Sequence, residues 1–139
     1  MTPPLLVDTG ALLLALEGEE PWAGLLEDAS VRVLPGLVLA EVDYHLRNHR
    51  PAMHRFLGDI DSGAYEYEAP TAADLVRARE LDRKFKSTEL GLVDATVAAL
   101  AERTGIHRLL TIDSDFAVVR IGPRFQVALE LVAPLPRRK

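Results

Sequence analysis

The sequence of 139 residues contains no cysteine, and this absence excludes several classes of protein together. Disulfide-stabilised scaffolds, zinc–thiolate sites and enzymes with a thiol nucleophile all depend on that residue. Any metal site must therefore be built from oxygen or histidine ligands. The absence also fits a reducing compartment, so we expect a cytoplasmic protein.

The chain also lacks a hydrophobic run long enough to cross a membrane. Its leucine-rich start, Leu5 to Leu16, has no basic residue before it and carries Asp8 inside it, unlike a signal peptide. Hydrophobic residues make up 48% and charged residues 27%, values usual for soluble domains. We therefore expect no membrane association, one domain over residues 1–133, and a basic tail at 134–139.

Positive charge is in short supply, since the formal net charge is −5. Proteins that bind nucleic acid through a broad basic surface neutralise phosphates with Lys and Arg, and this chain has too few for that. An acidic protein can still act on phosphates if carboxylates hold divalent metal ions that reverse the local charge. Five basic residues are candidates for a rim beside such a site: Arg47, Arg50, Arg83, Lys84 and Lys86.

Short apolar segments alternate with segments of helical periodicity along most of the chain. We expect strands at 5–7, 31–34, 65–68 and 108–112, and another within 125–132. We expect helices at 11–17, 21–29, 37–47, 51–60, 71–86 and 93–103. This alternation predicts a three-layer α/β/α domain with a mainly parallel central sheet.

Two aspartates follow predicted strands that are almost wholly apolar. Asp8 comes after Leu5 to Val7, and Asp113 comes after Leu109 to Ile112. Ligands of parallel sheets bind beyond the carboxyl ends of the strands, which makes both residues candidates for a site. The structural alternatives are a helix N-cap for Asp8 and an Asx turn for Asp113.

Two further acids lie on predicted helices. Glu41 is the odd residue of a stretch that is otherwise apolar enough to be largely buried, and it has no strong cation at helical spacing. Asp94 begins a helix whose apolar face includes Val97 and Ala98. The alternatives are that Glu41 reaches water at the edge of its face and that Asp94 only compensates the helix dipole.

The combination of these acids predicts more than each acid alone. Three or four carboxylates without cysteine or histidine are hard oxygen ligands, which suit Mg²⁺ or Mn²⁺. Asp115 stands one residue beyond Asp113 and can add to the same site. Three hydroxyl residues stand beside the acids and can orient them or a bound water: Thr9, Thr111 and Ser114.

The arrangement of these segments resembles the PIN-domain ribonucleases, and within them the VapC-like toxins of type II toxin–antitoxin systems. The resemblance covers nearly the whole chain. It rests on the order and spacing of Val7-Asp8-Thr9-Gly10-Ala11-Leu12, Leu39-Ala40-Glu41-Val42, Leu92-Val93-Asp94-Ala95 and Leu110-Thr111-Ile112-Asp113-Ser114-Asp115-Phe116. Gly10 departs from the serine that is commoner in the family and removes a hydroxyl from the site.

The resemblance implies a metal-dependent endoribonuclease in which Asp8, Glu41, Asp94 and Asp113 form the acidic quartet. Asp115 is an additional or substituting acid. It also implies Mg²⁺ or Mn²⁺ as cofactor, RNA as substrate, a cognate antitoxin protein as inhibitor, and a homodimer. Three alternatives stay open: a non-catalytic α/β interaction domain, a housekeeping PIN nuclease of RNA processing, and a flap-type DNA nuclease.

Overall fold

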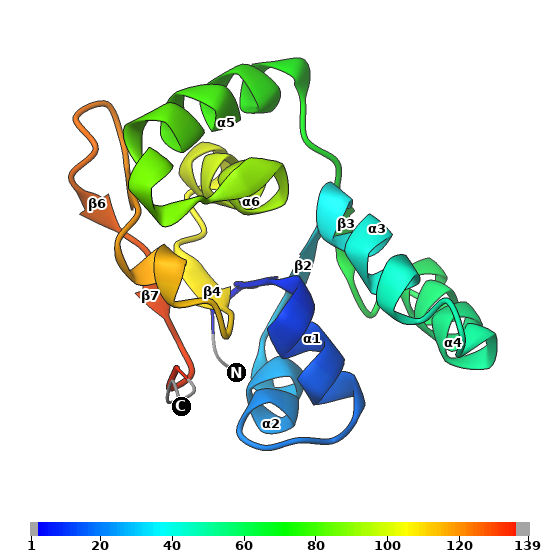
Figure 1. The fold of residues 1–139 in the computed structure, drawn as a ribbon. Coiled ribbons are helices and arrows are strands. Elements are labelled where there is room, and N and C mark those ends of the chain that lie inside the picture. Colours follow the sequence, from blue (N-terminus) through cyan, green and yellow to red (C-terminus); the bar gives the residue numbers. More distant parts are fainter. Residues whose placement is uncertain (1–2, 136–139) are drawn as a thin grey trace.

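The computed structural model describes residues 3–135 and shows a chain in which strands and helices alternate (Figure 1). The first half contains β1 (Leu5–Val7), α1 (Thr9–Leu16), α2 (Trp22–Asp28), β2 (Arg32–Pro35), α3 (Gly36–His45), α4 (Arg50–Asp61) and β3 (Glu66–Glu68). The second half contains α5 (Ala72–Lys84), η1 (Lys86–Thr88), α6 (Gly91–Thr104), β4 (Arg108–Leu110), η2 (Ser114–Ala117), β5 (Arg120–Ile121), β6 (Val127–Ala128) and β7 (Glu130–Leu131).

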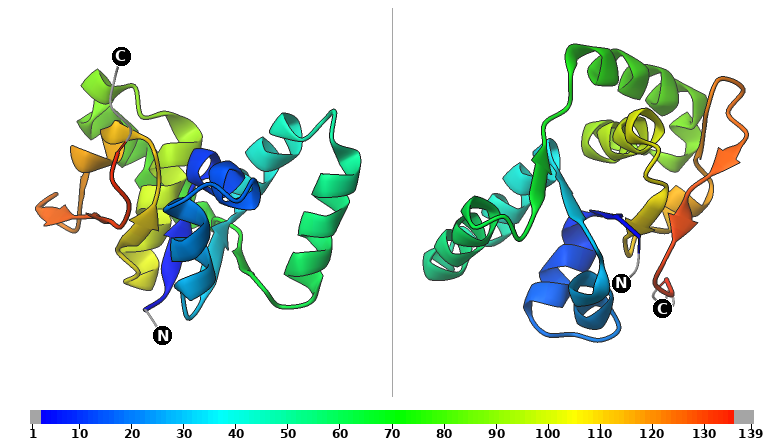
Figure 2. Two further views of the ribbon diagram at one scale, coloured as in Figure 1. Left: turned by 90° about the horizontal axis from the view of Figure 1, so that it is seen from below. Right: turned by 180° about the vertical axis from the view of Figure 1, so that it is seen from behind.

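The central sheet has five strands within residues 3–135, in the order β3-β2-β1-β4-β7, and every neighbouring pair is parallel. Its middle strand β1 is buried over its whole length, as expected of a strand covered on both faces. Helices α1 and α2 cover one face, whereas α5 and α6 cover the other (Figures 1 and 2). The predicted three-layer α/β/α architecture is confirmed. Helices α3 and α4 extend from the sheet beside β3 (Figure 1).

Some element boundaries differ from the prediction. Strand β4 ends at Leu110, so Thr111 already lies beyond the sheet. The predicted strand within 125–132 is two short strands, of which β7 joins the central sheet while β6 pairs antiparallel with β5. Helix α5 ends at Lys84 and a turn of 3₁₀ helix, η1, follows it. Strand β5 was not predicted, because two residues carry no readable periodicity.

Helix α5 begins with the capping interaction that its sequence predicts. The Thr71 hydroxyl accepts from the Asp74 backbone, and the Asp74 carboxylate accepts from the Thr71 backbone. Arg103 of α6 donates to both oxygens of Asp74 at 3.0 Å, which ties the two helices together.

The structure bears differently on the predicted basic tail and on the predicted absence of membrane association. The basic residues of the predicted tail at 134–139 lie at 137–139, outside the described residues. Over residues 3–135, no helix is long and apolar enough to cross a membrane.

Candidate active site

Asp8 stands where β1 ends and α1 begins, at the carboxyl edge of the sheet. Its side chain is buried, and its Oδ2 accepts a hydrogen bond of 2.9 Å from the Thr111 hydroxyl. Although Asp8 occupies the N-cap position of α1, its carboxylate makes no capping bond to the helix. The structure therefore does not support capping as the role of this side chain.

Thr111 connects two of the predicted site acids through one buried hydroxyl. It follows β4, the strand beside β1, and is only 1% exposed. Its oxygen accepts from the Asp113 backbone N–H at 3.0 Å while the hydroxyl donates to Asp8. The residues that follow β1 and β4 are thus held together by a short chain of hydrogen bonds through Thr111.

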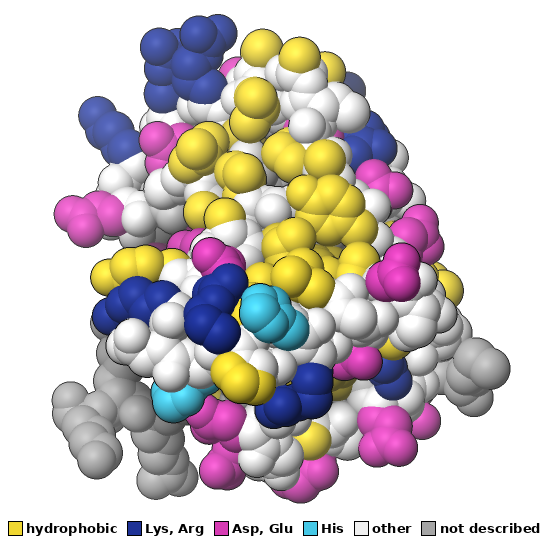
Figure 3. Space-filling view, turned by 90° about the vertical axis from the view of Figure 1, so that its right-hand side faces the viewer, with side chains coloured by type: hydrophobic (Ala, Val, Ile, Leu, Met, Phe, Trp, Pro, Cys, Tyr) yellow, Lys and Arg dark blue, Asp and Glu magenta, His cyan; other side chains and the backbone are white. Residues whose placement is uncertain are grey.

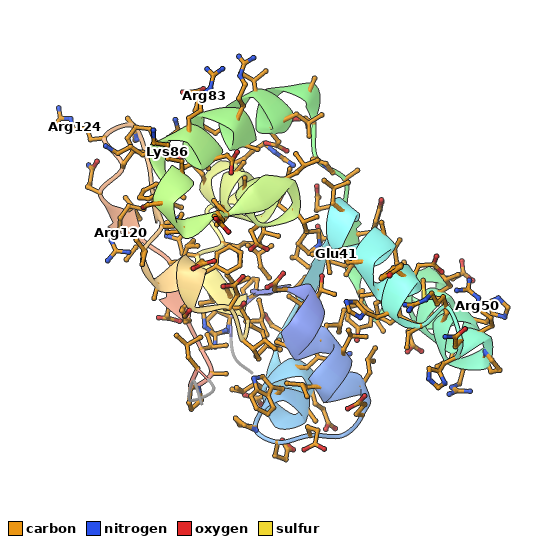
Figure 4. The ribbon with its side chains drawn as sticks, in the orientation of Figure 1. Glu41, Arg50, Arg83, Lys86, Arg120 and Arg124 are labelled. Atoms are coloured by element: carbon orange, nitrogen blue, oxygen red, sulfur yellow. The ribbon has the colours of Figure 1, made fainter. Side chains whose placement is uncertain are left out.

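Glu41 reaches the same region from α3, on the side of that helix that faces α1 (Figure 4). Its Oε1 accepts a hydrogen bond of 2.5 Å from the Thr9 hydroxyl at the start of α1. The expectation of a largely buried stretch was wrong, because Glu41 is half-buried and Ala40 is exposed. Only Val38 and Val42 of this segment are buried completely, since α3 packs on the sheet along a narrow face.

Asp113 caps η2 and Asp94 lies in the first turn of α6. The Oδ1 of Asp113 accepts from the Asp115 backbone N–H at 2.9 Å, so the Asx-type turn considered from the sequence is present. Asp94 is half-buried and shares a side-chain hydrogen bond with Asp113. The closeness of Asp113 favours the protonated form of Asp94, because two ionised carboxylates repel each other.

The electrostatics show that the four predicted acids affect one another. Burial raises the pKa of Asp8 from 3.8 to about 6, hydrogen bonds from Thr111 and Thr9 lower it in part, and the charges of Asp113 and Glu41 raise it further. The pKa of Asp94 is also raised, from 3.8 to about 8. Burial is the largest cause, and the charge of Asp8 and the interaction with Asp113 add to it. The structure thus brings together four carboxylates that come from four different segments.

None of the ion pairs within residues 3–135 involves these four acids. A buried aspartate elsewhere in the molecule shows the contrast. Burial alone would raise the pKa of Asp74, but hydrogen bonds from Arg103 and Thr71 and the charge of Arg103 hold that pKa below its usual value. The acidic cluster has no such compensation, so a bound cation would stabilise it.

The site has two features that the sequence did not reveal. One is the pairing of each acid with a particular hydroxyl, Asp8 with Thr111 and Glu41 with Thr9. The other is the reason for glycine at position 10: a Cβ there would lie 2.7 Å from the Cδ1 of Ile112. The space that a serine would need is therefore occupied by an apolar side chain. Ser114 and Asp115 are half-buried in η2, next to Asp113.

Comparison with known families adds an independent observation. A sequence profile described as the PIN domain matches residues 5–122. The chain belongs to the PIN domain family. The matched span runs from β1 through β5 and includes every predicted site acid.

Individual PIN-domain relatives are similar over most of their length. Ribonuclease VapC26 from Mycobacterium tuberculosis (strain ATCC 25618 / H37Rv) is 29% identical over 133 residues, which cover 88% of this chain and 98% of that protein. The crystal structure of VapC20 from Mycobacterium tuberculosis, described as a sarcin–ricin loop cleaving toxin, has a TM-score of 0.70 at 26% identity and covers 82% of this chain and 93% of its own. A chain of a toxin–antitoxin complex from Klebsiella pneumoniae has a TM-score of 0.70 at 20% identity, and the match covers 92% of this chain and 99% of that chain.

The donor set of this PIN domain fits a hard divalent cation, because every candidate ligand is a carboxylate oxygen. As the side chains stand, no three acidic or histidine residues within 3–135 converge closely enough to hold one ion together.

Proposed function

We propose that this protein is a divalent-metal-dependent endoribonuclease and the toxin of a toxin–antitoxin pair. The observation that carries the proposal is the cluster of Asp8, Glu41, Asp94 and Asp113 at the carboxyl edge of the sheet, in which the pKa values of Asp8 and Asp94 are raised and no acid takes part in an ion pair within residues 3–135. Family membership supports a nuclease, and the names of VapC26 and VapC20 support RNA as the substrate.

We assign the metal to Asp8, Asp94 and Asp113, with Glu41 as a fourth acid and Asp115 as an additional ligand. Bound Mg²⁺ or Mn²⁺ would supply an activated water for attack on the phosphodiester and would stabilise the departing oxygen. Because the pKa of Asp94 is raised to about 8, metal binding near neutral pH would release the proton of this carboxyl group.

The chain's own hydroxyls have a positioning role in this proposal. Thr111 fixes the Oδ2 of Asp8 and Thr9 fixes the Oε1 of Glu41, so that both carboxylates are oriented for a ligand. Ser114 supports the turn that carries Asp113.

Cleavage of a labelled RNA in Mn²⁺ or Mg²⁺ tests the function. Asp8→Asn and Asp94→Asn should each lower the rate by more than about 100-fold, beyond the effect of losing a supporting residue. Asp43→Asn is the matched control, because Asp43 lies two residues from Glu41 but pairs with Arg50 at the surface. Full activity of the two site variants, or of the wild type in excess chelator, would refute the proposal.

The alternatives make different predictions in the same experiment. A folded protein that binds no Mn²⁺ and cleaves no RNA would be a non-catalytic interaction domain. A housekeeping RNA-processing nuclease would cleave RNA without arresting growth on expression, whereas a toxin should arrest growth unless a cognate antitoxin encoded beside it is co-expressed. A single-stranded DNA of the same sequence tests the preference for RNA.

Two protein partners belong to this proposal, the antitoxin and a second copy of the chain. Apolar side chains gather on the side of the molecule shown in Figure 3. Tyr44 is 62% exposed and Leu92 is 60% exposed, and the hollows on either side of Leu92 are lined by α3, α5 and α6. We assign this face to the homodimer. If so, Leu92→Asp should shift the molecular mass in solution from dimer to monomer, and an unchanged mass would remove the assignment.

A further inference from the structure

The basic side chains of the protein are of two kinds, those with an acidic or carbonyl partner and those without. Seven arginines have such a partner: Arg32, Arg47, Arg50, Arg77, Arg103, Arg108 and Arg120. Exposed Arg55 and Arg79 make no ion pair or hydrogen bond within residues 3–135. The same is true of three others, Arg83, Lys86 and Arg124. Their charge is therefore available to a ligand.

These three residues come from two segments that are far apart in sequence but packed together. Phe125, in the turn after β5, lies 6.3 Å from the ring of Phe85, which follows α5. The Lys84 ammonium stands 5.4 Å from the same Phe125 ring, and Arg77 of α5 donates to the Gly122 carbonyl at 2.9 Å. The end of α5 and the β5–β6 turn thus form one surface.

The sign of the charge on this surface is opposite to that of the whole chain. Between Arg83 and Leu90 the sequence has three basic residues and one acid, Glu89. Between Phe116 and Leu129 it has Arg120 and Arg124 and no acid. Figure 4 shows Arg83, Lys86, Arg120 and Arg124 along the same side of the molecule, whereas Arg50 lies at its other end.

Both segments lead directly into the acidic cluster. Lys86 is in η1, the turn before the helix that carries Asp94. Arg120 follows η2, which Asp113 caps, and its guanidinium is held by the Ala117 and Val119 carbonyls. The basic surface is therefore joined to the cluster by the two chain segments that carry Asp94 and Asp113.

We propose that Arg83, Lys86 and Arg124 form a basic rim that binds the RNA backbone beside the cleaved phosphodiester. The inference rests on the proposed function for the identity of the ligand. An RNA strand with one phosphate in the cluster must place its neighbouring phosphates on the bordering surface, and unpaired Lys and Arg side chains neutralise them. Arg50, considered from the sequence, is excluded because it pairs with Asp43 at 2.7 Å.

The test compares two triple variants of the full chain that remove the same charge. The rim variant is Arg83→Gln, Lys86→Gln and Arg124→Gln. The control variant is Arg47→Gln, Arg50→Gln and Arg55→Gln, which changes α4 and the turn between α3 and α4 at the other end of the molecule. Arg120 is kept in both, because its bonds to backbone carbonyls stabilise the turn after η2.

Binding of a fluorescein-labelled single-stranded RNA is measured in chelator, so that it does not depend on cleavage. Each lost phosphate contact lowers the salt slope by about 0.7, so the rim variant should lose about 2 from the slope of log K against log salt. Between about 50 and 200 mM salt, wild-type binding should then weaken about fifteenfold more than that of the rim variant. With Mn²⁺, the rim variant should raise KM about tenfold and leave kcat unchanged.

The outcomes separate this inference from the proposed function. Binding and slope that are equal in the rim and control variants would overturn the rim, whether or not the wild type cleaves RNA. A wild type that does not cleave RNA in Mn²⁺ would overturn the proposed function, yet a selective loss of binding in the rim variant would still support the rim. If labelled poly-glutamate bound as tightly as RNA and lost as much in the rim variant, the surface would be a docking site for an acidic protein and the inference would be wrong.

Discussion

The acidic cluster should make the metal-free protein less stable, and Asp94→Asn should reverse this effect. The pKa of Asp94 is raised from 3.8 to about 8, and each pKa unit corresponds to about 1.4 kcal/mol. The raised pKa of Asp94 can therefore lower the free energy of unfolding by at most about 5 kcal/mol at a pH near 8. Because Asp94 is only half-buried and shares its shift with Asp8 and Asp113, we expect the substitution to recover about 2 kcal/mol.

The dependence on pH follows from the sign of the shift. Since the folded protein holds the proton more tightly than the unfolded chain, wild-type stability falls as the pH rises from about 4 to about 8. The advantage of Asp94→Asn should therefore be largest near pH 8, at about 6 °C in Tm, and should disappear near pH 4. Thermal unfolding in chelator, monitored by circular dichroism, measures the difference in Tm between the variant and the wild type at pH 8 and at pH 4.

Asp74→Asn is the control of opposite sign. The pKa of Asp74 is lowered by Arg103 and Thr71, so its ionised form stabilises the protein at neutral pH and that contribution is lost as the pH falls. Asn at this position should lower the unfolding free energy by about 1 kcal/mol or more through the lost cap and ion pair. If Asp94→Asn were also destabilising near pH 8 in chelator, the acids would not repel one another as argued.

Two further predictions concern the metal and position 10. The affinity for Mn²⁺ should rise between about pH 6 and pH 8 with release of protons, because Asp8 and Asp94 hold protons in that range. Calorimetry in buffers of different ionisation enthalpy measures both the affinity and the number of protons released. An affinity that does not depend on pH would contradict the raised pKa values. Gly10→Ser should lower the free energy of unfolding by about 1–2 kcal/mol, because the serine Cβ would overlap Ile112. Adding Ile112→Ala to the same chain should relieve the overlap. Urea unfolding of the single and the double variant measures both effects.

The sequence was sufficient to predict the sheet and the position of two acids on it. Leu5 to Val7 is apolar at every position, which predicts a central parallel strand, and the residue after such a strand lies at the edge where ligands bind. The position of Asp8 follows from this rule. The position of Asp113 follows as well, although the strand before it ends two residues earlier than predicted. Nothing more than alternation of strands and helices was needed for the three layers.

The sequence was not sufficient for features that depend on tertiary packing. Helical spacing predicts which residues share a face, but not how much of α3 the sheet covers, and so Glu41 was expected to be more buried than it is. The bond from Thr9 to Glu41 spans 32 positions and leaves no local pattern. In the same way, Arg50 and Lys86 look equivalent along the chain until the structure pairs one with Asp43 and leaves the other without a partner.

The acidic cluster and the basic rim have opposite effects on RNA before metal binds. The rim attracts phosphates, whereas the cluster carries negative charge where a phosphate must lie. One ionised carboxylate about 6 Å from a phosphate opposes binding by about 0.7 kcal/mol in a high-dielectric surrounding, or about threefold in affinity. In chelator at a pH above about 9, where Asp94 is ionised, Asp94→Asn should therefore bind labelled RNA about threefold more tightly than the wild type, although it is the variant expected to lose cleavage. The rim variant should change affinity in the other direction. Weaker binding by Asp94→Asn in chelator would mean that the phosphate does not approach the cluster, and the site would then have to be placed elsewhere on the sheet edge.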